Sequence, residues 1–469
     1  MTLVAGVDSS TQSCKVVIRE LESGKILRTG SAKHPDGTEV DPNSWFTALN
    51  EAISAAGGIE DVSAISIGAQ QHGMVVLDEN GFVIRKALLW NDTRSAISAE
   101  DLIGEFSAER FANSTGSVPV ASFTITKLRW LRDNEPENAA KVAAVALPHD
   151  WLTWRLRGFG PTGESEFGPV FDELRTDRSD ASGTGYFNSV TNEYEYDLLE
   201  GALGKRAHLP RIVNAGESAG TDSAGRIYGP GAGDNAAAAL GLGLNAGDVA
   251  ISIGTSGTVF ASSATPALDV SGTVAGFADA SGSYLPIGVT LNAARILKSA
   301  TDLLNVDFDE LSRLALSADP GSSGLVLVPY FEGERTPNLP NAKASLHGMT
   351  LASATRANFA RAYIEGMLCG LAYGLDALIA NGVKADRVLL IGGGAQNEAV
   401  QQVAATIFGV PVEVPAVSEY VAEGASVQAA LALTGKRPDW KPEVTARYGA
   451  GAVQLVRDQY NAAVAALTS

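Results

Sequence analysis

The sequence has 469 residues, of which 45% are hydrophobic and 19% charged, and its formal net charge at pH 7 is −18. A chain of this length is too long for one ordinary hydrophobic core, so two or more domains are expected. The negative charge argues against a surface for nucleic acids or anionic membranes, and it means that local features must capture any anionic ligand.

The first half of the chain begins with three short apolar segments separated by polar turns, which predict a meander of strands. A helix is expected after Pro42, closed by glycine, and Asn80-Gly81 predicts a hairpin turn. Three meandering strands, then a helix, then a strand indicate a ribonuclease H-like α/β domain. The strands are expected at residues 3–7, 15–20, 26–32 and 63–70.

The second half repeats this order of elements. Residues 291–304 carry apolar side chains at helical spacing, and a longer helix is expected over about 357–380. A strand, a glycine turn and a helix are expected over residues 387–400. The other expected elements are strands at 248–254, 258–264, 281–290 and 410–415 and a last helix at 423–435.

Two polar segments, GVDSSTQS near the start and ISIGTSGT near residue 251, resemble each other. Sliding one onto the other places Ser10-Thr11 over Gly254-Thr255, which indicates two related domains. We place the boundary in the stretch LGLGLNAG, so the predicted domains are residues 1–245 and 246–469. The predicted fold class is α/β, with two ribonuclease H-like domains hinged around a cleft.

The cysteines and the N-terminal residues indicate the compartment. Cys14 and Cys369 lie in apolar stretches and are interpreted as core residues, so neither a disulfide framework nor a metal cluster is expected. The N-terminus has no basic segment ahead of an apolar one, and no uninterrupted apolar run of transmembrane length stands out. The sequence favours a cytoplasmic protein without a membrane partner.

Two common nucleotide-binding signatures are absent. Gly-Lys occurs at Gly24, Gly204 and Gly435 without a following Ser or Thr, so the chain has no Walker-type phosphate loop. The segment GLGLNA at 241–246 matches a dinucleotide fingerprint in its spacing. It leaves a helix and enters a strand, however, whereas that fingerprint needs the order strand, turn, helix.

Two loops of similar composition predict a site for phosphates. Tight turns rich in glycine and hydroxyl side chains form nests of backbone N–H donors, and such nests suit phosphate oxygens. Either loop alone is better explained as an ordinary hairpin turn, but both at the same point of a repeated domain favour two loops that grip one polyphosphate. The candidate residues are Ser10, Thr11 and Lys15 in the first loop and Gly254, Thr255 and Ser256 in the second.

Asp8 stands at a strand end beside the first loop. A carboxylate that faces phosphates repels them unless a cation lies between, so Asp8 is a candidate for organising Mg²⁺, directly or through water. The alternative is an Asp that caps a turn.

Polar side chains at two further strand ends suit a polyhydroxylated ligand, in which each hydroxyl group needs a hydrogen-bond partner. The segment QQHGMV directly follows a strand, and LLWNDTRS places an aromatic face beside polar groups. A structural histidine and an aromatic turn are the alternatives. The candidate ligand contacts are Gln71, His72, Trp90, Asn91, Asp92 and Arg94.

Two more groups of candidates lie at helix starts. In IGGGAQNEA the glycine backbone can approach a flat base closely, so Gly393, Gly394 and Asn397 are candidate nucleotide contacts. Asp234, in GPGAGDNAAAALGLG, stands between a glycine-rich approach and an alanine-rich helix. By itself it is interpreted as an N-cap, which satisfies the free N–H groups of a helix start.

Together these segments strongly resemble the FGGY carbohydrate kinases of the hexokinase/actin-type superfamily, over nearly the whole chain. Within the family the sequence is most similar to the xylulokinases. It departs from the usual pattern where Ser10 replaces a glycine, Gln71 a methionine and Tyr363 a smaller or aliphatic residue. The matching segments are VDSSTQSCK, QQHG, LLWNDTR, SFTITKLRWLRDN, SDASGTGYF, AGDNAAAALGLG, SIGTSGTV, VPYFEGERTPNLPNAKA and IGGGAQNEA.

The resemblance implies ATP-dependent phosphorylation of a sugar with Mg²⁺, and conversion of D-xylulose to D-xylulose 5-phosphate. It implies that Asp234 is the general base, that Asp8 is an acid near the metal, and that Gln71 and His72 contact the sugar. The expected partners are a small sugar and ATP, and a homodimer is compatible with the sequence. Ribulokinase, gluconokinase and glycerol kinase activities are alternatives, followed by a non-catalytic actin-like ATPase or sugar sensor.

Overall fold

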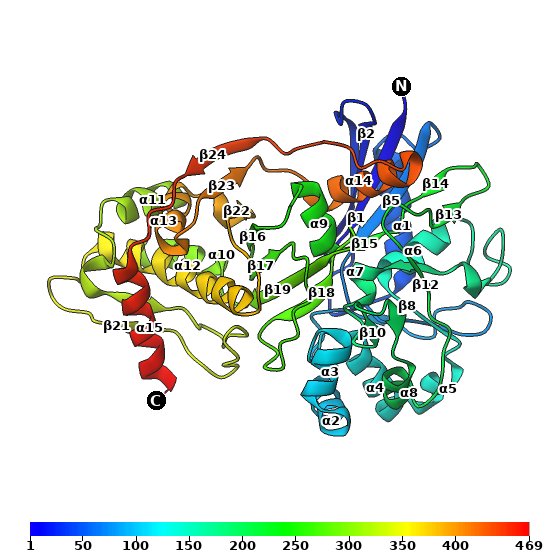
Figure 1. Cartoon of the computed structure of the whole chain (residues 1–469), viewed down its shortest axis with the longest axis horizontal. Coiled ribbons are helices and arrows are strands. Elements are labelled where there is room, and N and C mark those ends of the chain that lie inside the picture. Colours follow the sequence, from blue (N-terminus) through cyan, green and yellow to red (C-terminus); the bar gives the residue numbers. More distant parts are fainter. Residues whose placement is uncertain (469) are drawn as a thin grey trace.

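Each half of the chain forms a seven-stranded mixed sheet, and the two sheets build two lobes that lie side by side (Figure 1). The computed structural model describes residues 1–468. The lobe built mainly from the first half is blue to cyan in Figure 1, and the other lobe is mainly yellow to red.

The first sheet has the strand order β13-β14-β5-β1-β2-β3, with β15 paired to β5. Every residue of its central strand β1 is buried, as expected for a strand covered on both faces. The strands are β1 Leu3–Ser9, β2 Ser13–Glu20, β3 Ile26–Lys33, β5 Val62–Ala69, β13 Gly220–Thr221, β14 Ile227–Tyr228 and β15 Ala232–Gly233.

The second sheet has the strand order β18-β19-β17-β16-β22-β23-β24. Its strands are β16 Asp248–Ile253, β17 Gly257–Ala261, β18 Ala275–Ala278, β19 Tyr284–Thr290, β22 Arg387–Ile391, β23 Val412–Pro415 and β24 Val444–Tyr448. Short two-stranded pairs complete the strands: β4 Glu39–Val40 with β7 Ala87–Leu88, β6 Val75–Leu77 with β8 Ala144–Ala146, β9 Arg175–Asp177 with β12 Arg211–Val213, β10 Phe187–Asn188 with β11 Glu193–Tyr194, and β20 Val326–Val328 with β21 Ser345–His347.

The two sheets share a topology. In each, the first strand pairs antiparallel with the second and parallel with a later strand that follows a helix. The two loops predicted to be equivalent therefore occupy equivalent positions. One is the hairpin turn between β1 and β2, and the other is the hairpin turn between β16 and β17. The predicted fold class, α/β with two ribonuclease H-like domains, is confirmed.

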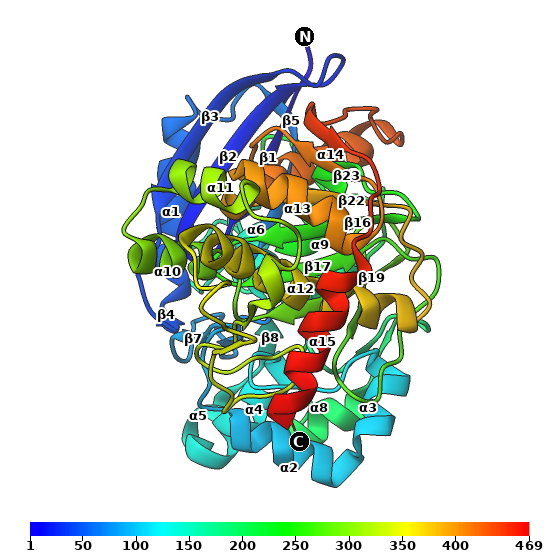
Figure 2. The same ribbon diagram turned by 90° about the vertical axis from the view of Figure 1, so that its left-hand side faces the viewer.

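Helices cover the sheets and carry the apolar faces that close the cores. In the first half they are α1 Pro42–Ala55, α2 Ala96–Phe106, α3 Ala108–Thr115, α4 Thr124–Asn134, α5 Pro136–Lys141, α6 Pro148–Leu156, α7 Arg178–Ala181, α8 Tyr196–Leu203 and α9 Asp234–Leu242. In the second half they are α10 Ala294–Leu304, α11 Phe308–Leu316, α12 Arg356–Ala380, α13 Glu398–Phe408, α14 Tyr420–Thr434 and α15 Gln454–Thr468. Figure 2 shows α10, α11, α13 and α15 on the outer side of the second lobe.

The helix α14 comes from the second half of the chain but packs on the first sheet. It contacts β1, β5 and α9, and Figure 1 shows it in orange beside the blue strands. Glycines allow this approach, because a Cβ at Gly424 would overlap the carbonyl oxygen of Ala237 and one at Gly6 would overlap that of Ala422. The domain boundary at residue 245 stays a prediction. The helix α14 follows this boundary in sequence but packs on the sheet that precedes it.

The helix α12 is long and apolar enough to cross a membrane by length and composition alone. It runs through the core of the second lobe, and 78% of its apolar window is buried inside the protein. The pair Arg361–Glu365, with 2.7 Å between Nε and Oε1, interrupts its apolar sequence. Burial in the core accounts for its composition.

The hairpin predicted at Asn80-Gly81 forms. An antiparallel bridge joins Leu77 to Val83, and the N–H groups of Asp78 and Ile84 donate to the carbonyls of Phe82 at 2.9 Å and Val76 at 3.0 Å. The first arm of this hairpin, β6, also pairs with β8. Both cysteines are buried and free, as expected.

We expect Gly424→Ala to destabilise the protein by about 1–3 kcal/mol, because the added methyl group forces α14 away from α9. Gly104→Ala is the matched control, since a Cβ there meets nothing within 4 Å and α2 gains a better helix former. Urea denaturation of both variants measures the difference. Equal stability of the two variants would show that α14 is not closely packed.

Candidate active site

Asp234 is the first residue of α9, at the point where the chain leaves the first sheet through β15. Gly233, rather than Asp234, occupies the N-cap position. The Oδ1 atom of Asp234 accepts hydrogen bonds from the backbone N–H of Asn235 at 2.8 Å and from its Nδ2 at 2.9 Å. These bonds fix the carboxylate of a half-buried side chain at the helix start.

Three neighbouring cavities share residues of their walls, and Asp234 lines two of them. We call them the central cavity of about 380 Å³, the Gln71 cavity of about 310 Å³ and the Gly393 cavity of about 690 Å³. The central cavity shares Asp234, Asn235 and Ser252 with the Gln71 cavity, and it shares Gly393 and Gln396 with the Gly393 cavity. Asp234 therefore stands in the wall between two of the three spaces.

Asp8 and Asp234 both line the central cavity, and the charge of Asp234 acts on Asp8. Burial raises the pKa of Asp8 to about 7, and the charge of Asp234 contributes to this rise. Burial likewise raises the pKa of Asp234 to about 6, against the lowering effect of its bonds from Asn235. The Oδ1 atom of Asp8 is buried without a hydrogen-bond partner in residues 1–468.

The first predicted loop lies next to this pair but does not line the cavities itself. Ser10 closes the β1–β2 turn through its backbone N–H, which donates to the carbonyl of Ser13 at 3.1 Å. Lys15 lies across the hairpin from Asp8, and its Nζ is 2.6 Å from Oε2 of Glu419 in the wall of the central cavity. Glu419 thus already neutralises the charge of Lys15.

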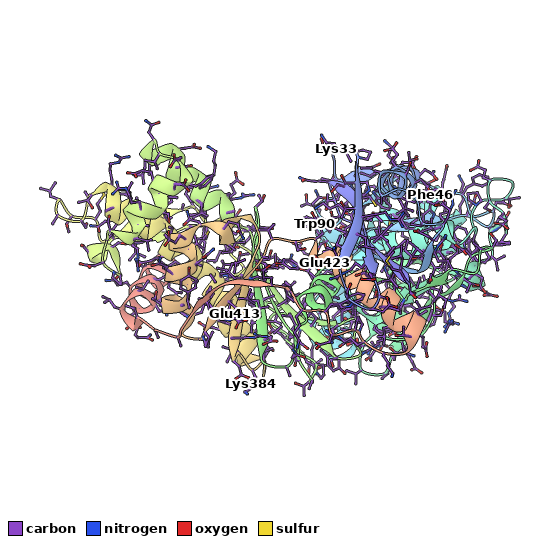
Figure 3. All side chains as sticks on the ribbon, turned by 90° about the horizontal axis from the view of Figure 1, so that it is seen from above. Lys33, Phe46, Trp90, Lys384, Glu413 and Glu423 are labelled. Carbon is purple, nitrogen blue, oxygen red and sulfur yellow. The ribbon has the colours of Figure 1, made fainter. Side chains whose placement is uncertain are left out.

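Trp90 joins the first loop to the Gln71 cavity. Its indole N–H donates to Oγ1 of Thr11 at 2.9 Å, and its side chain lines the cavity while remaining 42% exposed. Figure 3 shows Trp90 on the side of the first lobe that faces the second lobe. The hydrogen bond therefore places an aromatic face where the two lobes approach.

The second loop and the glycine turn line the cavities directly. Gly254, Thr255 and Ser256 lie in the wall of the Gln71 cavity, which Asp234 also lines. Gly393 and Gly394 lie in the wall of the Gly393 cavity. Asn397 also lines that cavity, but its Oδ1 caps α13 and its Nδ2 donates to the carbonyl of Phe308 at 3.1 Å.

Gln71 and His72 are buried at the end of β5 and line the Gln71 cavity. Nε2 of Gln71 donates to the carbonyl of Ser179 at 3.1 Å. His72 has a φ of 70°, in the left-handed region, and its carbonyl accepts from Nζ of Lys127 at 3.0 Å and from Thr124. Burial lowers the pKa of His72 to about 3, with a further contribution from Lys127, so the imidazole is neutral.

Asn91, Asp92 and Arg94 are not among the residues that line the Gln71 cavity. Oδ1 of Asp92 accepts from Nε of Arg94 at 2.9 Å, and Arg94 also pairs with Glu39 at 2.8 Å. These bonds tie the turn after β7 to the strand β4, which contains Glu39. We interpret Asp92 and Arg94 as structural, and a ligand contact by these three residues stays a prediction without support from the cavity.

Sequence reasoning missed several residues of the Gln71 cavity. Ser122 and Phe277 line it, and Arg335 reaches it from residues 328–344. Lys127, which holds the carbonyl of His72, lies in the segment SFTITKLRWLRDN, which contributed only to the family resemblance. The sequence of residues 328–344 contains one indication of a site. It is the arginine that lies between Glu334 and a proline-rich turn.

A buried ionic cluster lies behind the site. Nδ1 of His149 is 2.6 Å from Oδ2 of Asp180, and its Nε2 is 3.3 Å from Oδ1 of Asp150. The ligand atoms of these three residues are close enough to hold a metal ion, the one such group that residues 1–468 contain. The two carboxylates raise the pKa of His149 to about 10 against its burial, so a protonated imidazole accounts for the cluster.

Two lobes of one topology, with a carboxylate in the wall that two cavities share, form the two-domain architecture of the actin/hexokinase type. Models of the FGGY family of carbohydrate kinases match the chain, the N-terminal domain over residues 3–241 and the C-terminal domain over residues 249–433. The chain belongs to this family.

Several named proteins are similar to the chain in sequence or structure. A xylulose kinase of Streptomyces coelicolor is 43% identical over 449 residues, which are 92% of this chain and 89% of that protein. The crystal structure of xylulose kinase from Bifidobacterium adolescentis has 46% identity and a TM-score of 0.93, and 99% of each chain is covered. Gluconate kinase from Lactobacillus acidophilus shares the fold with a TM-score of 0.87 at 23% identity, over 100% of this chain and 97% of that one. The fold by itself therefore does not select the sugar.

We expect Asp8→Asn to stabilise the ligand-free protein at pH 8. A folded-state pKa above the unfolded value of 3.8 means that the folded protein holds the proton more firmly, so stability falls as the pH rises toward about 7. A tenfold difference in proton affinity between the folded and unfolded states corresponds to about 1.4 kcal/mol. Removal of the charge should therefore raise the free energy of unfolding at pH 8 by on the order of 2 kcal/mol.

Thermal unfolding in EDTA at pH 5 and pH 8 measures this effect. Asp36→Asn, at an exposed carboxylate, is the control and should leave the profile unchanged. A lower melting temperature of Asp8→Asn than of the unaltered protein at pH 8 would contradict the assignment of an electrostatically unfavourable carboxylate.

Proposed function

We propose that this protein transfers the terminal phosphoryl group of ATP to the terminal hydroxyl group of D-xylulose, giving D-xylulose 5-phosphate. The observation that carries the proposal is the position of Asp234 in the wall shared by the Gln71 cavity and the central cavity. The names of the Streptomyces and Bifidobacterium relatives support the choice of sugar.

Asp234 is the proposed general base. Phosphoryl transfer needs placement and charge neutralisation more than covalent chemistry, and the proton of the attacking hydroxyl group leaves late. A carboxylate with a pKa of about 6 is largely ionised at pH 7 yet more basic than an exposed Asp. Its bonds from Asn235 hold one oxygen, so the carboxylate keeps a fixed direction while it accepts the proton.

The sugar is proposed to occupy the Gln71 cavity. Because the neutral His72 donates its Nδ1 proton to the carbonyl of Gly183 at 2.6 Å, its Nε2 atom is left as an acceptor for a sugar hydroxyl group. Trp90 supplies an aromatic face, and the side-chain oxygen of Gln71 supplies a second acceptor. These groups match the polar and apolar faces of a ketose.

ATP is proposed to extend from the Gly393 cavity through the central cavity to Asp234. The glycine turn gives close backbone approach for the adenosine, and the two hairpin turns supply N–H groups for the phosphates. The proposed nucleotide contacts are Ser10, Thr11, Lys15, Gly254, Thr255, Ser256, Gly393, Gly394 and Asn397.

Asp8 is the residue that fits a magnesium ion. Its buried Oδ1 atom has no hydrogen-bond partner in the described chain, and burial and the charge of Asp234 raise its pKa although Lys15 lowers it. A bound Mg²⁺ would neutralise phosphate charge beside this carboxylate. Asp8 itself would hold the ion or one of its waters and thereby keep two repelling carboxylates in one cavity.

Other carbohydrates and other roles are tested in one experiment. An ADP-release assay with D-xylulose, L-ribulose, gluconate and glycerol should show the highest kcat/KM for D-xylulose. A higher value for another sugar would replace the proposed substrate by ribulokinase, gluconokinase or glycerol kinase activity. ADP release that is independent of sugar would favour an actin-like ATPase, and sugar binding without ADP release would favour a sensor.

The proposed substrates are small and water-soluble, and we propose that the enzyme works in the cytoplasm, where ATP is available. The net charge of −18 agrees with an enzyme that has neither nucleic acid nor an anionic membrane as its partner.

We expect Asp234→Asn to lower kcat by about 10²–10⁴-fold, the usual contribution of general-base catalysis, while ADP binding stays within about threefold. Steady-state kinetics and calorimetric titration with ADP measure the two quantities. Asp36→Asn serves as the remote carboxylate control and should retain full activity. Full activity of Asp234→Asn would reject the assignment.

We also expect a pH dependence of kcat/KM for the sugar. Because the pKa of Asp234 is raised to about 6, its base form is lost as the pH falls below that value, and the rate should drop with it. The pKa of Asp8 is raised to about 7, so the carboxyl group of Asp8 titrates in the same pH range. A profile measured from pH 5 to 9 that stays flat down to pH 5 would argue against Asp234 as the base.

A further inference from the structure

The walls around Asp234 contain few positive charges. Of the residues that line the central cavity and the Gln71 cavity, the one Lys or Arg in residues 1–468 is Arg335. The same walls hold the carboxylates of Asp8, Asp234 and Glu419. Lys15, the nearest lysine of the first loop, is already paired with Glu419.

The guanidinium group of Arg335 has no counterion. It forms no ion pair and no side-chain hydrogen bond within residues 1–468, although its side chain is half-buried. Burial alone lowers its pKa from the usual value, and no carboxylate offsets this effect. A desolvated and unpaired cation is unfavourable by itself, so its position indicates an anion that is bound during the reaction.

The neighbouring residue holds Arg335 in place. The carboxylate of Glu334 accepts from the backbone N–H of Leu291 at 2.6 Å, from Nδ2 of Asn292 at 2.9 Å and from the N–H of Arg335 itself at 2.8 Å. Nδ2 of Asn292 also donates to the carbonyl of Gly333 at 2.8 Å. The backbone that presents Arg335 is thus tied to the turn that follows β19 in the second lobe.

The guanidinium group lies where the two lobes meet. The cavity that it lines is bounded by Thr255 of the β16–β17 loop, and by His72 and Asp234 from the first lobe. His72 and Arg335 line the same cavity, and the charge of Arg335 contributes to the lowered pKa of His72. Arg335 can therefore reach a group held between the second loop and Asp234.

We propose that Arg335 is a catalytic residue that contacts the phosphoryl group in transit and donates guanidinium hydrogen bonds to its oxygens. This inference rests on the proposed kinase function. In the transfer, a bond forms between the sugar oxygen and the terminal phosphorus, and the bond from that phosphorus to the bridging oxygen of ADP breaks. Asp234 takes the hydroxyl proton, and Arg335 stays protonated throughout and only neutralises charge.

A contact with the sugar is the competing role. The hydroxyl groups of a sugar are neutral, so they would leave the guanidinium charge uncompensated in a desolvated wall. The planar fork of an arginine matches the oxygens of a phosphoryl group. The charge balance of the two cavities therefore favours the phosphoryl group.

Arg335→Gln and Arg335→Lys test the proposal, with Lys343→Gln as a control at a lysine of the same segment. We expect Arg335→Gln to lower kcat by about 10³-fold or more, the size found for arginines that stabilise phosphoryl transfer, with sugar KM changed less than about threefold. Arg335→Lys should recover part of the rate, and guanidine added to Arg335→Ala should restore activity. Thermal unfolding checks that each variant is folded.

A second measurement does not depend on which sugar is the substrate. The affinity for ADP with aluminium fluoride and Mg²⁺, a mimic of the phosphoryl group in transit, should exceed that for ADP alone, and Arg335→Gln should lose this gain. Unchanged kcat and unchanged affinity for the mimic would overturn the proposal, as would a rise in sugar KM with kcat retained. Lack of activity with every sugar would overturn the proposed function, while the mimic still decides the role of Arg335.

Discussion

The site depends on the burial of two carboxylates, Asp8 and Asp234, in one cavity whose wall has no lysine or arginine among the described residues. Desolvation raises both pKa values and mutual repulsion adds to the rise at Asp8, so the arrangement is unfavourable unless ligands complete it. An overall negative charge adds to the same field. Local donors, a divalent cation and the guanidinium group of Arg335 are the features that can make this cavity accept a polyphosphate.

The fold supplies those donors by repeating one hairpin in both lobes. In each lobe the first two strands form a hairpin whose turn lies beside the cavities or the carboxylates that line them. The equivalent turns bring Ser10 and Thr11 near one end of the site and Gly254 and Thr255 into its wall. The helix start at Asp234 then places a carboxylate between the proposed sugar side and the proposed phosphate side. Duplication explains why one ligand can be held from two directions.

Much of this arrangement could be predicted from local pattern. Apolar runs bounded by turns identified β1, β2, β5 and β16 within a few residues, because a buried central strand has little freedom in composition. The pairing of distant segments was less predictable. The dipeptide Asn80-Gly81 indicates the local hairpin, which forms, but it does not indicate that the first arm of this hairpin, β6, also pairs with the distant strand β8. Likewise, the sequence of α14 indicates a helix but not the sheet on which it packs.

For the candidate site, the sequence by itself determined the residue types at strand and helix ends: Asp8, Gln71, His72, Asp234 and the two polar turns. Each of these residues alone also has a structural explanation, in a turn or at a helix start, and the repeat of the polar turns together with the family resemblance points to a site. Only the tertiary structure decided that Asp92 and Arg94 pair with each other and Glu39, away from the cavity, and that Arg335 enters it. Burial and the balance of charge arise from segments far apart in the chain, and no local pattern contains them.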